Sequence, residues 1–324
     1  CRRVVRSSSS SNPAGVYAPN GEDGTVSVID TDTNRVTTTV SIGGDLLGVA
    51  ITPDGASAYV GGFAGAVSVI DTETNAVVDT IAVGSQPRDI AFTPGGKFAY
   101  VTDQGVNAAW RIDTATRVVV GSSIPVGNGA TAIATTPDGA FAYVVNVCGD
   151  GPCDPIAPGT VSIIDTGSNT VARTVSVGYR AVGIAMAPGG AAAYVANQCG
   201  DDPNCTSGGT VSVLDTATQT VVHTIAVGQL GTQCIAVAPD GGVAYVSNTA
   251  ANTVSMIDTA TNRVVGSPIP VGAAPCGLAV TSDGQFVYVA NQLDDSVSVI
   301  ASATNAEVAT VRVGNHPAFL AIKP

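Results

Sequence analysis

The protein has 324 residues, with 25 acidic against 13 basic side chains and a formal net charge of −12 at pH 7. Such an acidic surface repels phosphate backbones, so nucleic acid is excluded as the default partner, whereas cations and basic partners are favoured. Hydrophobic residues make up 45% of the chain but aromatic residues only 5%. A core of Val, Ile, Ala and Gly favours stacked sheets, and no apolar run has the length of a membrane-spanning helix.

The first 14 residues, CRRVVRSSSSSNPA, are basic and then Ser-rich and lack apolar periodicity. This composition predicts a flexible tail in front of one domain that spans residues 15–324. Cys1 could carry the lipid anchor of a bacterial lipoprotein. The alternative is that the sequence simply begins at an arbitrary position.

A repeat organises the rest of the chain. Its marker is the Asp that ends each V-S-V-I-D run, and it recurs at intervals of 41 to 52 residues at Asp30, Asp71, Asp113, Asp165, Asp215 and Asp258, with Ala301 in the seventh place. Each repeat contains four β-rich runs separated by turn residues. In the third repeat these runs are Asp89–Thr93, Phe98–Thr102, Ala108–Asp113 and Val118–Val126. We therefore predict that each repeat forms one four-stranded antiparallel sheet.

The four runs differ in polarity, which predicts their order in each sheet. The first and third are apolar, whereas the fourth accepts Pro125 and Pro270 and is therefore an outer edge. Sheets of this kind, arranged around an axis, make an all-β, seven-bladed β-propeller. The last first-type run, at Ala318, has no strands after it, and Val16–Asn20 has no first strand before it. We therefore expect the C-terminal strand to close the ring by pairing with the three N-terminal strands.

The runs Ala99-Tyr100-Val101-Thr102-Asp103 and Tyr245-Val246-Ser247-Asn248, together with TVSVIDT and TPDG, resemble the YVTN-family β-propellers of bacterial and archaeal periplasmic and surface proteins. The resemblance covers residues 15–324. It implies a binding or interaction scaffold. Related seven-bladed propellers include lactonases, a streptogramin lyase and quinone-cofactor dehydrogenase subunits, so a lactonase-like hydrolase or a lyase with its active site at the channel mouth is the alternative function.

Two long loops between second and third strands each contain a close pair of cysteines. Cys148 lies near Cys153, and Cys199 lies near Cys205. We expect both pairs to form disulfides that stiffen the loops, because zinc binding would require further ligands and no His is nearby. Disulfides predict an oxidising compartment, so the protein is expected to be secreted, periplasmic or on the cell surface.

The same loops are acidic. Their carboxylates belong to Asp150, Asp154, Asp201 and Asp202, and we expect Glu22, Asp23, Asp103, Asp294 and Asp295 on the same face. One interpretation is a solvated acidic rim that favours a cationic protein or small-molecule partner. The alternative is a Ca²⁺ site on the first four, since hard cations bind several oxygen ligands. No other cofactor is expected.

Cys234 and Cys276 begin the inner strands of neighbouring blades, and His316 occupies the corresponding connection of the next blade. All three are expected near the channel mouth. The two cysteines could be small buried hydrophobes or form a third disulfide. With His316, they could instead form a soft-metal cluster, or a thiol nucleophile with a His base.

Several other polar residues are expected at the same mouth as ligand-binding residues: Arg88, Asp89, Tyr179, Arg180, Gln229 and Gln233, together with His316. Arg88 and Arg180 suit a carboxylate. Were the protein an enzyme, the catalytic candidates would be His316, Arg88, Arg180, Cys234 and Cys276. His223 lies on a predicted outer strand and is expected to be inert. The preferred prediction is an exported, monomeric binding scaffold that uses its acidic loop face.

Overall fold

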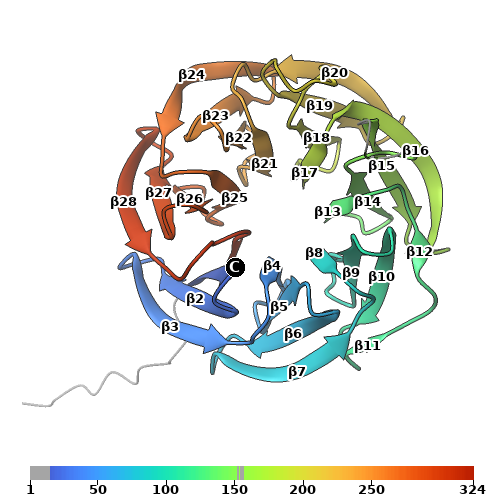
Figure 1. The fold of residues 1–324 in the computed structure, drawn as a ribbon, viewed down its shortest axis with the longest axis vertical. Helices are drawn as coiled ribbons and strands as arrows, with labels where there is room; N and C mark the ends of the chain where they lie inside the picture. Colours follow the sequence, from blue (N-terminus) through green and yellow to red (C-terminus); the bar gives the residue numbers. More distant parts are fainter. Residues whose placement is uncertain (1–14, 152, 154–156) are drawn as a thin grey trace, which may run out of the picture.

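The computed structural model describes residues 15–151, 153 and 157–324, and seven β-sheets surround a central axis (Figure 1). The predicted tail, residues 1–14, lies outside the described residues. The seven-bladed propeller with four-stranded antiparallel blades is confirmed. Within the described part of the chain, no helix has the length and apolar character needed to cross a membrane.

The inner strands are β4 (Leu46–Ile51), β8 (Pro87–Phe92), β13 (Ala130–Thr135), β17 (Ala181–Met186), β21 (Thr232–Val237), β25 (Pro275–Val280) and β29 (Ala321–Ile322). The second strands are β1 (Gly15–Asn20), β5 (Ser57–Gly62), β9 (Phe98–Asp103), β14 (Phe141–Asn146), β18 (Ala192–Asn197), β22 (Val243–Asn248) and β26 (Phe286–Asn291). The third strands are β2 (Thr25–Asp30), β6 (Ala66–Asp71), β10 (Ala108–Asp113), β15 (Pro158–Asp165), β19 (Thr210–Asp215), β23 (Thr253–Asp258) and β27 (Ser296–Ala301). The outer strands are β3 (Arg35–Ser41), β7 (Ala76–Ala82), β11 (Val118–Val119) with β12 (Ile124–Pro125), β16 (Thr170–Tyr179), β20 (Thr220–Ala226), β24 (Arg263–Pro270) and β28 (Ala306–Arg312).

The outer strand of the third blade departs from the prediction. A single strand was expected over Val118–Val126, but β11 and β12 are two short strands that both pair with β10. Gly121 lies between them with a φ of 80°, a conformation that breaks a regular strand. The strand is thus interrupted by a glycine in a left-handed conformation.

The core lies between blades. Tyr17, Val26 and Val28 of the first blade pack against Leu46 and Ile70 of the second, and equivalent clusters recur around the ring. Both faces of the second and third strands are covered, which explains their continuous apolar runs. Each blade is therefore stabilised mainly by its neighbours.

The repeated Asp makes the predicted turn between third and fourth strands. Asp71 Oδ1 accepts hydrogen bonds from the backbone N–H of Thr74 at 2.8 Å and from its hydroxyl at 2.7 Å. Asn75 follows in the left-handed region, and its side chain accepts a hydrogen bond of 2.7 Å from Tyr17 of the preceding blade. The recurrence of Asp, Thr and Asn thus reflects turn formation and contact between blades.

The Asn that ends the second strand joins neighbouring blades in a similar way. Asn197 Nδ2 donates to the hydroxyls of Thr210 and Ser212 in its own blade, at 3.1 and 2.9 Å. A Cβ added to Gly178, in the connection from the preceding blade, would lie 2.7 Å from the Asn197 Cγ atom. The connection must therefore carry glycine at this point.

The chain ends close the ring in the first blade, as predicted. β29 pairs with β1, placing Ile322 opposite Val16 and Ala321 opposite Tyr17. Ala318 N donates to the Pro19 carbonyl at 3.1 Å. Figure 1 shows the C-terminal segment on the axial side of the N-terminal strands.

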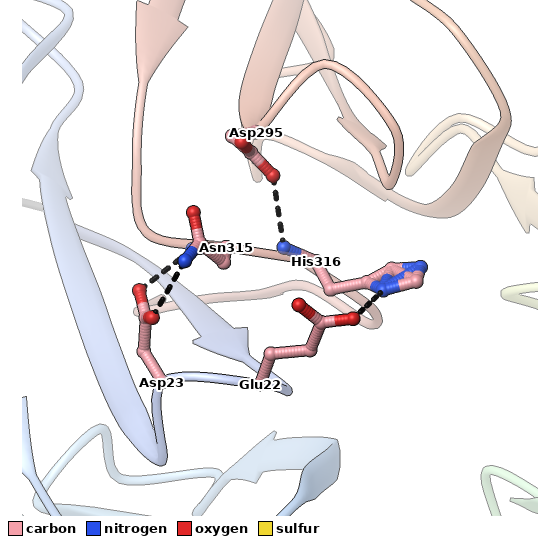
Figure 2. A network of polar contacts seen from close by, with 5 residues as sticks. All are labelled: Glu22, Asp23, Asp295, Asn315 and His316. Carbon is pink, nitrogen blue, oxygen red and sulfur yellow. Dashed lines mark hydrogen bonds and ion pairs between the residues drawn. The ribbon is translucent and has the colours of Figure 1, made fainter.

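Polar contacts fasten this closure on the face where the blade-to-blade connections emerge (Figure 2). Asn315 donates its backbone N–H and its side-chain amide to the two carboxylate oxygens of Asp23, at 2.7 and 2.9 Å. His316 N donates to Asp295 Oδ1 at 3.1 Å. Three segments far apart in sequence are thus tied together; we call this region the closure seam.

Leu320 lies at the joint that closes the ring, where it is 8% exposed and packs with Tyr288 and Val297 of the last blade. We therefore predict that replacing it lowers the stability of the protein strongly. We expect Leu320→Ala to lower the free energy of unfolding by about 2 to 4 kcal/mol, because it leaves a cavity at the joint. The matched control is Val308→Ala on the outer strand β28, 55% exposed, which should cost less than about 0.5 kcal/mol. Urea denaturation measures both, and equal costs would contradict a stabilising closure.

Candidate functional site

The inner strands are irregular at the loop face. Every inner strand from β4 to β25 shifts its pairing register around its second residue, as between Pro87 and Ile90 or between Thr232 and Ile235. Such bulges re-aim side chains and often lie next to functional sites. We call the second and third residues of the inner strands, with Ala318 and Phe319 in the first blade, the bulge ring. Its second positions are Leu47, Arg88, Thr131, Val182, Gln233, Cys276 and Ala318, and its third positions are Gly48, Asp89, Ala132, Gly183, Cys234, Gly277 and Phe319.

Most third positions are small because neighbouring inner strands approach closely. A Cβ added to Gly48 would lie 2.0 Å from the Arg88 carbonyl oxygen. The exceptions are Asp89, Cys234 and Phe319, which face one cavity of about 130 Å³ on the axis. This cavity is completed by Ala132, Gly183, Ile184, Ile235 and Leu278.

In the third blade, Asp89 spans the contact to the next inner strand. Its Oδ1 accepts a hydrogen bond from Ile90 N and its Oδ2 from Ile133 N, both at 2.9 Å. Protein atoms surround the carboxylate although it keeps some accessible surface toward the cavity. Desolvation raises its pKa to about 6, against the opposing effect of the two hydrogen bonds and the positive charge of Arg88.

Arg88 lies beside Asp89 but bonds elsewhere. Its Nη1 donates to Gln104 Oε1 at 2.7 Å, and its buried Nε has no partner among the described residues. Its charge also acts on Cys276, three blades away around the ring, and favours the thiolate there. The guanidinium thus contributes positive potential to the channel mouth.

The sixth blade carries a second polar pair. Gln233 Nε2 donates to Cys276 Sγ at 3.3 Å, and Thr249 donates its hydroxyl to Gln233 Oε1 at 2.6 Å. Cys234 N donates to Ser247 Oγ at 3.0 Å, while Ser247 donates to the Cys276 carbonyl at 2.7 Å. Both members of the pair are therefore held by the adjacent second strand or its loop.

The third and sixth blades share a supporting hydroxyl that the others lack. Thr102 accepts a hydrogen bond from Asp89 N at 3.0 Å, as Ser247 does from Cys234 N. The equivalent residues elsewhere are Pro19, Gly61, Val145, Ala196 and Ala290. β8 and β21 lie across the axis from each other (Figure 1), and Asp89 of the one and Cys234 of the other line the same cavity.

Thr102, Gln104, Ser247 and Thr249 were not singled out from sequence as site residues. Their signal was present in the second strands: only Y-V-T-D and Y-V-S-N carry a hydroxyl one residue before the strand ends.

The Cys234 and Cys276 thiols are free, with their Sγ atoms 3.9 Å apart. The third disulfide considered above is therefore not formed. Their mutual hydrogen bond and burial raise the pKa of Cys234, so Cys234 stays protonated. His316 does not join them, since its ring contacts Glu22. Within residues 15–151, 153 and 157–324, no group of three or more His, Cys, Asp or Glu side chains could hold a metal ion.

The remaining predicted ligand residues lie outside the bulge ring. Tyr179 and Arg180 form the turn between β16 and β17, where Tyr179 N donates to the Gly200 carbonyl at 2.7 Å and Arg180 is exposed. The Gln229 carbonyl accepts from Gly209 N at 2.9 Å. The structure thus brings Arg88, Asp89, Gln233, Cys234 and Cys276 together but separates Tyr179, Arg180, Gln229 and His316 from them. His223 is exposed on β20, as expected.

The long loops of the fourth and fifth blades contain the two predicted disulfides, Cys148–Cys153 and Cys199–Cys205. Asp202 shapes the second loop, because its carboxylate accepts hydrogen bonds from Asn204 N, Thr206 N, the Thr206 hydroxyl and Ser207 N. These bonds hold the pKa of Asp202 well below its usual range. Asp150 and Asp201 are exposed, and Asp154 lies outside the described residues.

Asp103 was expected on the acidic rim but is fully buried. Its carboxylate accepts from Ser85 N at 2.7 Å, Gln86 N at 3.0 Å and Trp110 Nε1 at 3.3 Å. It takes the place that Asn occupies at the end of the second strand in five other blades, and it holds the preceding connection. Asp294 accepts a hydrogen bond from Ala273 N but stays exposed, so the burial of Asp103 removes one carboxylate from the predicted acidic rim.

Comparison with known proteins agrees with this architecture. A family model described as "Lactonase, 7-bladed beta-propeller" matches residues 206–315, from the Cys199–Cys205 loop to the closure seam. No curated protein matches the chain.

Solved structures show the same fold at low identity. Hydrazine synthase of Kuenenia stuttgartiensis is 24% identical, with a TM-score of 0.77 over 86% of this chain and 90% of that one. A functionally unknown protein from Desulfotomaculum acetoxidans is 19% identical, with a TM-score of 0.78 over 95% and 98%. Dihydro-heme d1 dehydrogenase NirN, solved in complex with DHE, is 15% identical, with a TM-score of 0.63 over 94% and 74%.

The raised pKa of Asp89 predicts an unusual dependence of stability on pH. The folded protein holds this proton up to about pH 6, whereas the unfolded chain releases it near its ordinary value of 3.8. Stability should therefore fall as pH rises through this window. The turn aspartates, such as Asp71 and Asp113, have lowered pKa values and act in the opposite direction, but their contribution is complete by about pH 5.

We expect the free energy of unfolding to fall by about 1 kcal/mol between about pH 5 and pH 7. Urea denaturation across this range measures it. The fall should be absent in Asp89→Ala, so comparing the two proteins removes the contribution of the two histidines. An equal fall in the variant would show that Asp89 does not titrate in this window.

Proposed function

We propose that the chain is an exported ligand-binding propeller whose ligand seat is the bulge ring at the channel mouth. The observation that carries this proposal is that Asp89 and Cys234, from strands on opposite sides of the axis, line one cavity, and that the backbone of each is bound by a second-strand hydroxyl. Desolvating a carboxylate such as Asp89 is costly even when hydrogen bonds offset part of the cost. The two disulfides support an oxidising compartment.

The geometry favours a ligand that ends in a carboxylate or acyl oxygen. Arg88 supplies a guanidinium fork, and Gln233 is oriented opposite by Thr249. The cavity of about 130 Å³ admits one functional group rather than a drug-sized molecule. The rest of the ligand would lie on the loop face above it.

The two Cys-closed loops would form one wall of this seat. They belong to the fourth and fifth blades, which lie between the third and sixth blades on the ring. Asp150 and Asp201 are exposed there, and they favour a cationic group on the ligand or on a protein partner. The disulfides stiffen the loops and so reduce the entropy lost on binding.

Calorimetric titration with small carboxylic acids, including succinate and N-acetyl amino acids, tests the seat. We expect Arg88→Ala to weaken any binding at least tenfold, because the carboxylate loses its charged partner. The matched control, Arg312→Ala, removes an exposed charge from the outer strand β28 and should leave binding unchanged. Equal binding by the wild type and Arg88→Ala would exclude the bulge ring as the seat.

Lactone hydrolysis is the second candidate, favoured by the family match over residues 206–315 and by the pKa of Asp89 near neutrality. A carboxylate with such a pKa is a suitable general base. Asp89 would take a proton from the water that attacks the lactone carbonyl carbon. The ring C–O bond would then break, the leaving oxygen would take up a proton, and the product would be a hydroxy acid held by Arg88.

Assays of γ- and δ-lactone hydrolysis test this second candidate, with the acid released by the reaction measured at constant pH. We expect Asp89→Asn to lower kcat at least about 100-fold, with Arg312→Ala unchanged. Thermal unfolding of each variant shows whether it is folded. A folded Asp89→Asn protein with wild-type rates, or a wild type that hydrolyses none of these lactones, would exclude the mechanism.

A further inference from the structure

A second pocket, of about 230 Å³, opens on the loop face at the closure seam. Leu46, Leu47 and Phe63 of the second blade form its apolar wall. The lining is completed by Gly21, Glu22, Asp45, Gln292, His316 and Ala318. It shares no lining residue with the cavity inside the bulge ring. The two are therefore separate candidate sites on one face.

The backbone of His316 is held in a left-handed conformation beside this pocket. Its φ is 60°, in the left-handed region that residues other than glycine rarely adopt. Two hydrogen bonds fix it there: His316 N donates to Asp295 Oδ1 at 3.1 Å, and the His316 carbonyl accepts from Gly21 N at 3.0 Å. The same left-handed conformation recurs at Gly129, Arg180, Gly231 and Ala274 in the corresponding connections of other blades. It therefore belongs to the repeat, and it fixes the point from which the His316 side chain projects toward the pocket.

The imidazole is oriented as well. His316 Nδ1 lies 3.2 Å from Glu22 Oε1 (Figure 2). When Nδ1–H donates to the carboxylate, Nε2 is the unprotonated nitrogen of the neutral ring and can accept a hydrogen bond. Nε2 has no hydrogen-bond partner among the described residues, and the side chain lines the pocket.

Phe63 provides an aromatic surface next to this acceptor. It is 44% exposed, and it is the only aromatic residue at the first loop position after a second strand. The other blades have Gly21, Gln104, Val147, Gln198, Thr249 and Gln292 there. An apolar wall beside a few polar groups is the usual form of a small-molecule site, and here the polar groups belong to Glu22, Asp45, Gln292 and His316.

We propose that this pocket binds a small phenol: one apolar ring against Phe63 and Leu47, and one hydroxyl that donates to His316 Nε2. The size is suitable, because a cavity of about 150 Å³ already holds benzene. The charge argues against an anionic ligand, since Glu22 and Asp45 lie at the pocket edge. The ligand class thus differs from that proposed for the bulge ring.

Titrating the protein with p-cresol tests the assignment, with binding monitored through the protein's amide chemical shifts. We expect saturable shifts centred on His316, Phe63 and Leu47. Anisole, which has the ring but no hydroxyl proton, and benzoate, which is charged, should each bind at least tenfold more weakly. Equal binding of p-cresol and anisole would remove His316 Nε2 from the proposal, and no saturable shift with p-cresol would overturn it.

Variants locate the site. Phe63→Ala changes an exposed side chain and should weaken p-cresol binding at least tenfold without unfolding the protein, whereas Leu293→Ala, 69% exposed on the same face but outside the pocket lining, should not. His316→Ala should act like Phe63→Ala, with His223→Ala on β20 as its control. Wild-type affinity in Phe63→Ala would contradict the proposal. Arg88→Ala should leave p-cresol binding unchanged, so this site can fail or succeed independently of the bulge ring.

Discussion

The rest of the structure depends on how closely seven inner strands can approach one axis. Where Gly277 stands, a Cβ would lie 2.5 Å from the Ala318 carbonyl oxygen of the next blade, nearer than such atoms ordinarily come. Each strand relieves this crowding with a bulge, which turns two successive residues toward the axis and the neighbouring blade. A side chain larger than a hydrogen or methyl group at the third position must therefore form specific contacts with the next blade.

Asp89 and Cys234 meet that requirement in different ways. Asp89 replaces close packing with a hydrogen bond to Ile133 N, at the cost of a desolvated carboxylate whose proton is held to about pH 6. Cys234 instead contacts the Cys276 thiol of the next blade. Thr102 and Ser247 then supply the hydroxyls that an irregular strand needs for its unpaired backbone groups. Both polar pairs thus use the same structural support, a hydroxyl one residue before the end of the second strand. This shared support argues that Asp89 and Cys234, the two polar exceptions to the small third position, belong to one site.

The sequence was sufficient to predict the seven blades and the closing strand, because both depend on local patterns that recur every 41 to 52 residues. It was also sufficient for the two disulfides, because the cysteines of each pair lie close together in the chain. It was insufficient for Asp103, which was predicted on the rim although five donors converge on its carboxylate in the place of the usual Asn. The hydrogen bond from Ile133 N to Asp89 was also beyond it, since a bulge changes side-chain direction without changing the hydrophobic pattern. His316 was placed at the seam, but its contact with Glu22 joins residues almost a full chain length apart.

The two candidate sites on the loop face differ more clearly in the charge of the ligand they favour than in their shape. With a formal net charge of −12, the protein repels anions at long range, and salt screens that repulsion over about 8 Å at physiological ionic strength. A carboxylate can bind only where a local cation outweighs this field, and within the bulge ring Arg88 meets that condition in a poorly solvated environment, where each charge acts more strongly. The seam pocket is lined by the Glu22 and Asp45 carboxylates together with the His316 imidazole. An uncharged ring with one hydroxyl avoids both the long-range repulsion and the cost of desolvating a charge, so one acidic face can discriminate between two ligands by their ionisation alone.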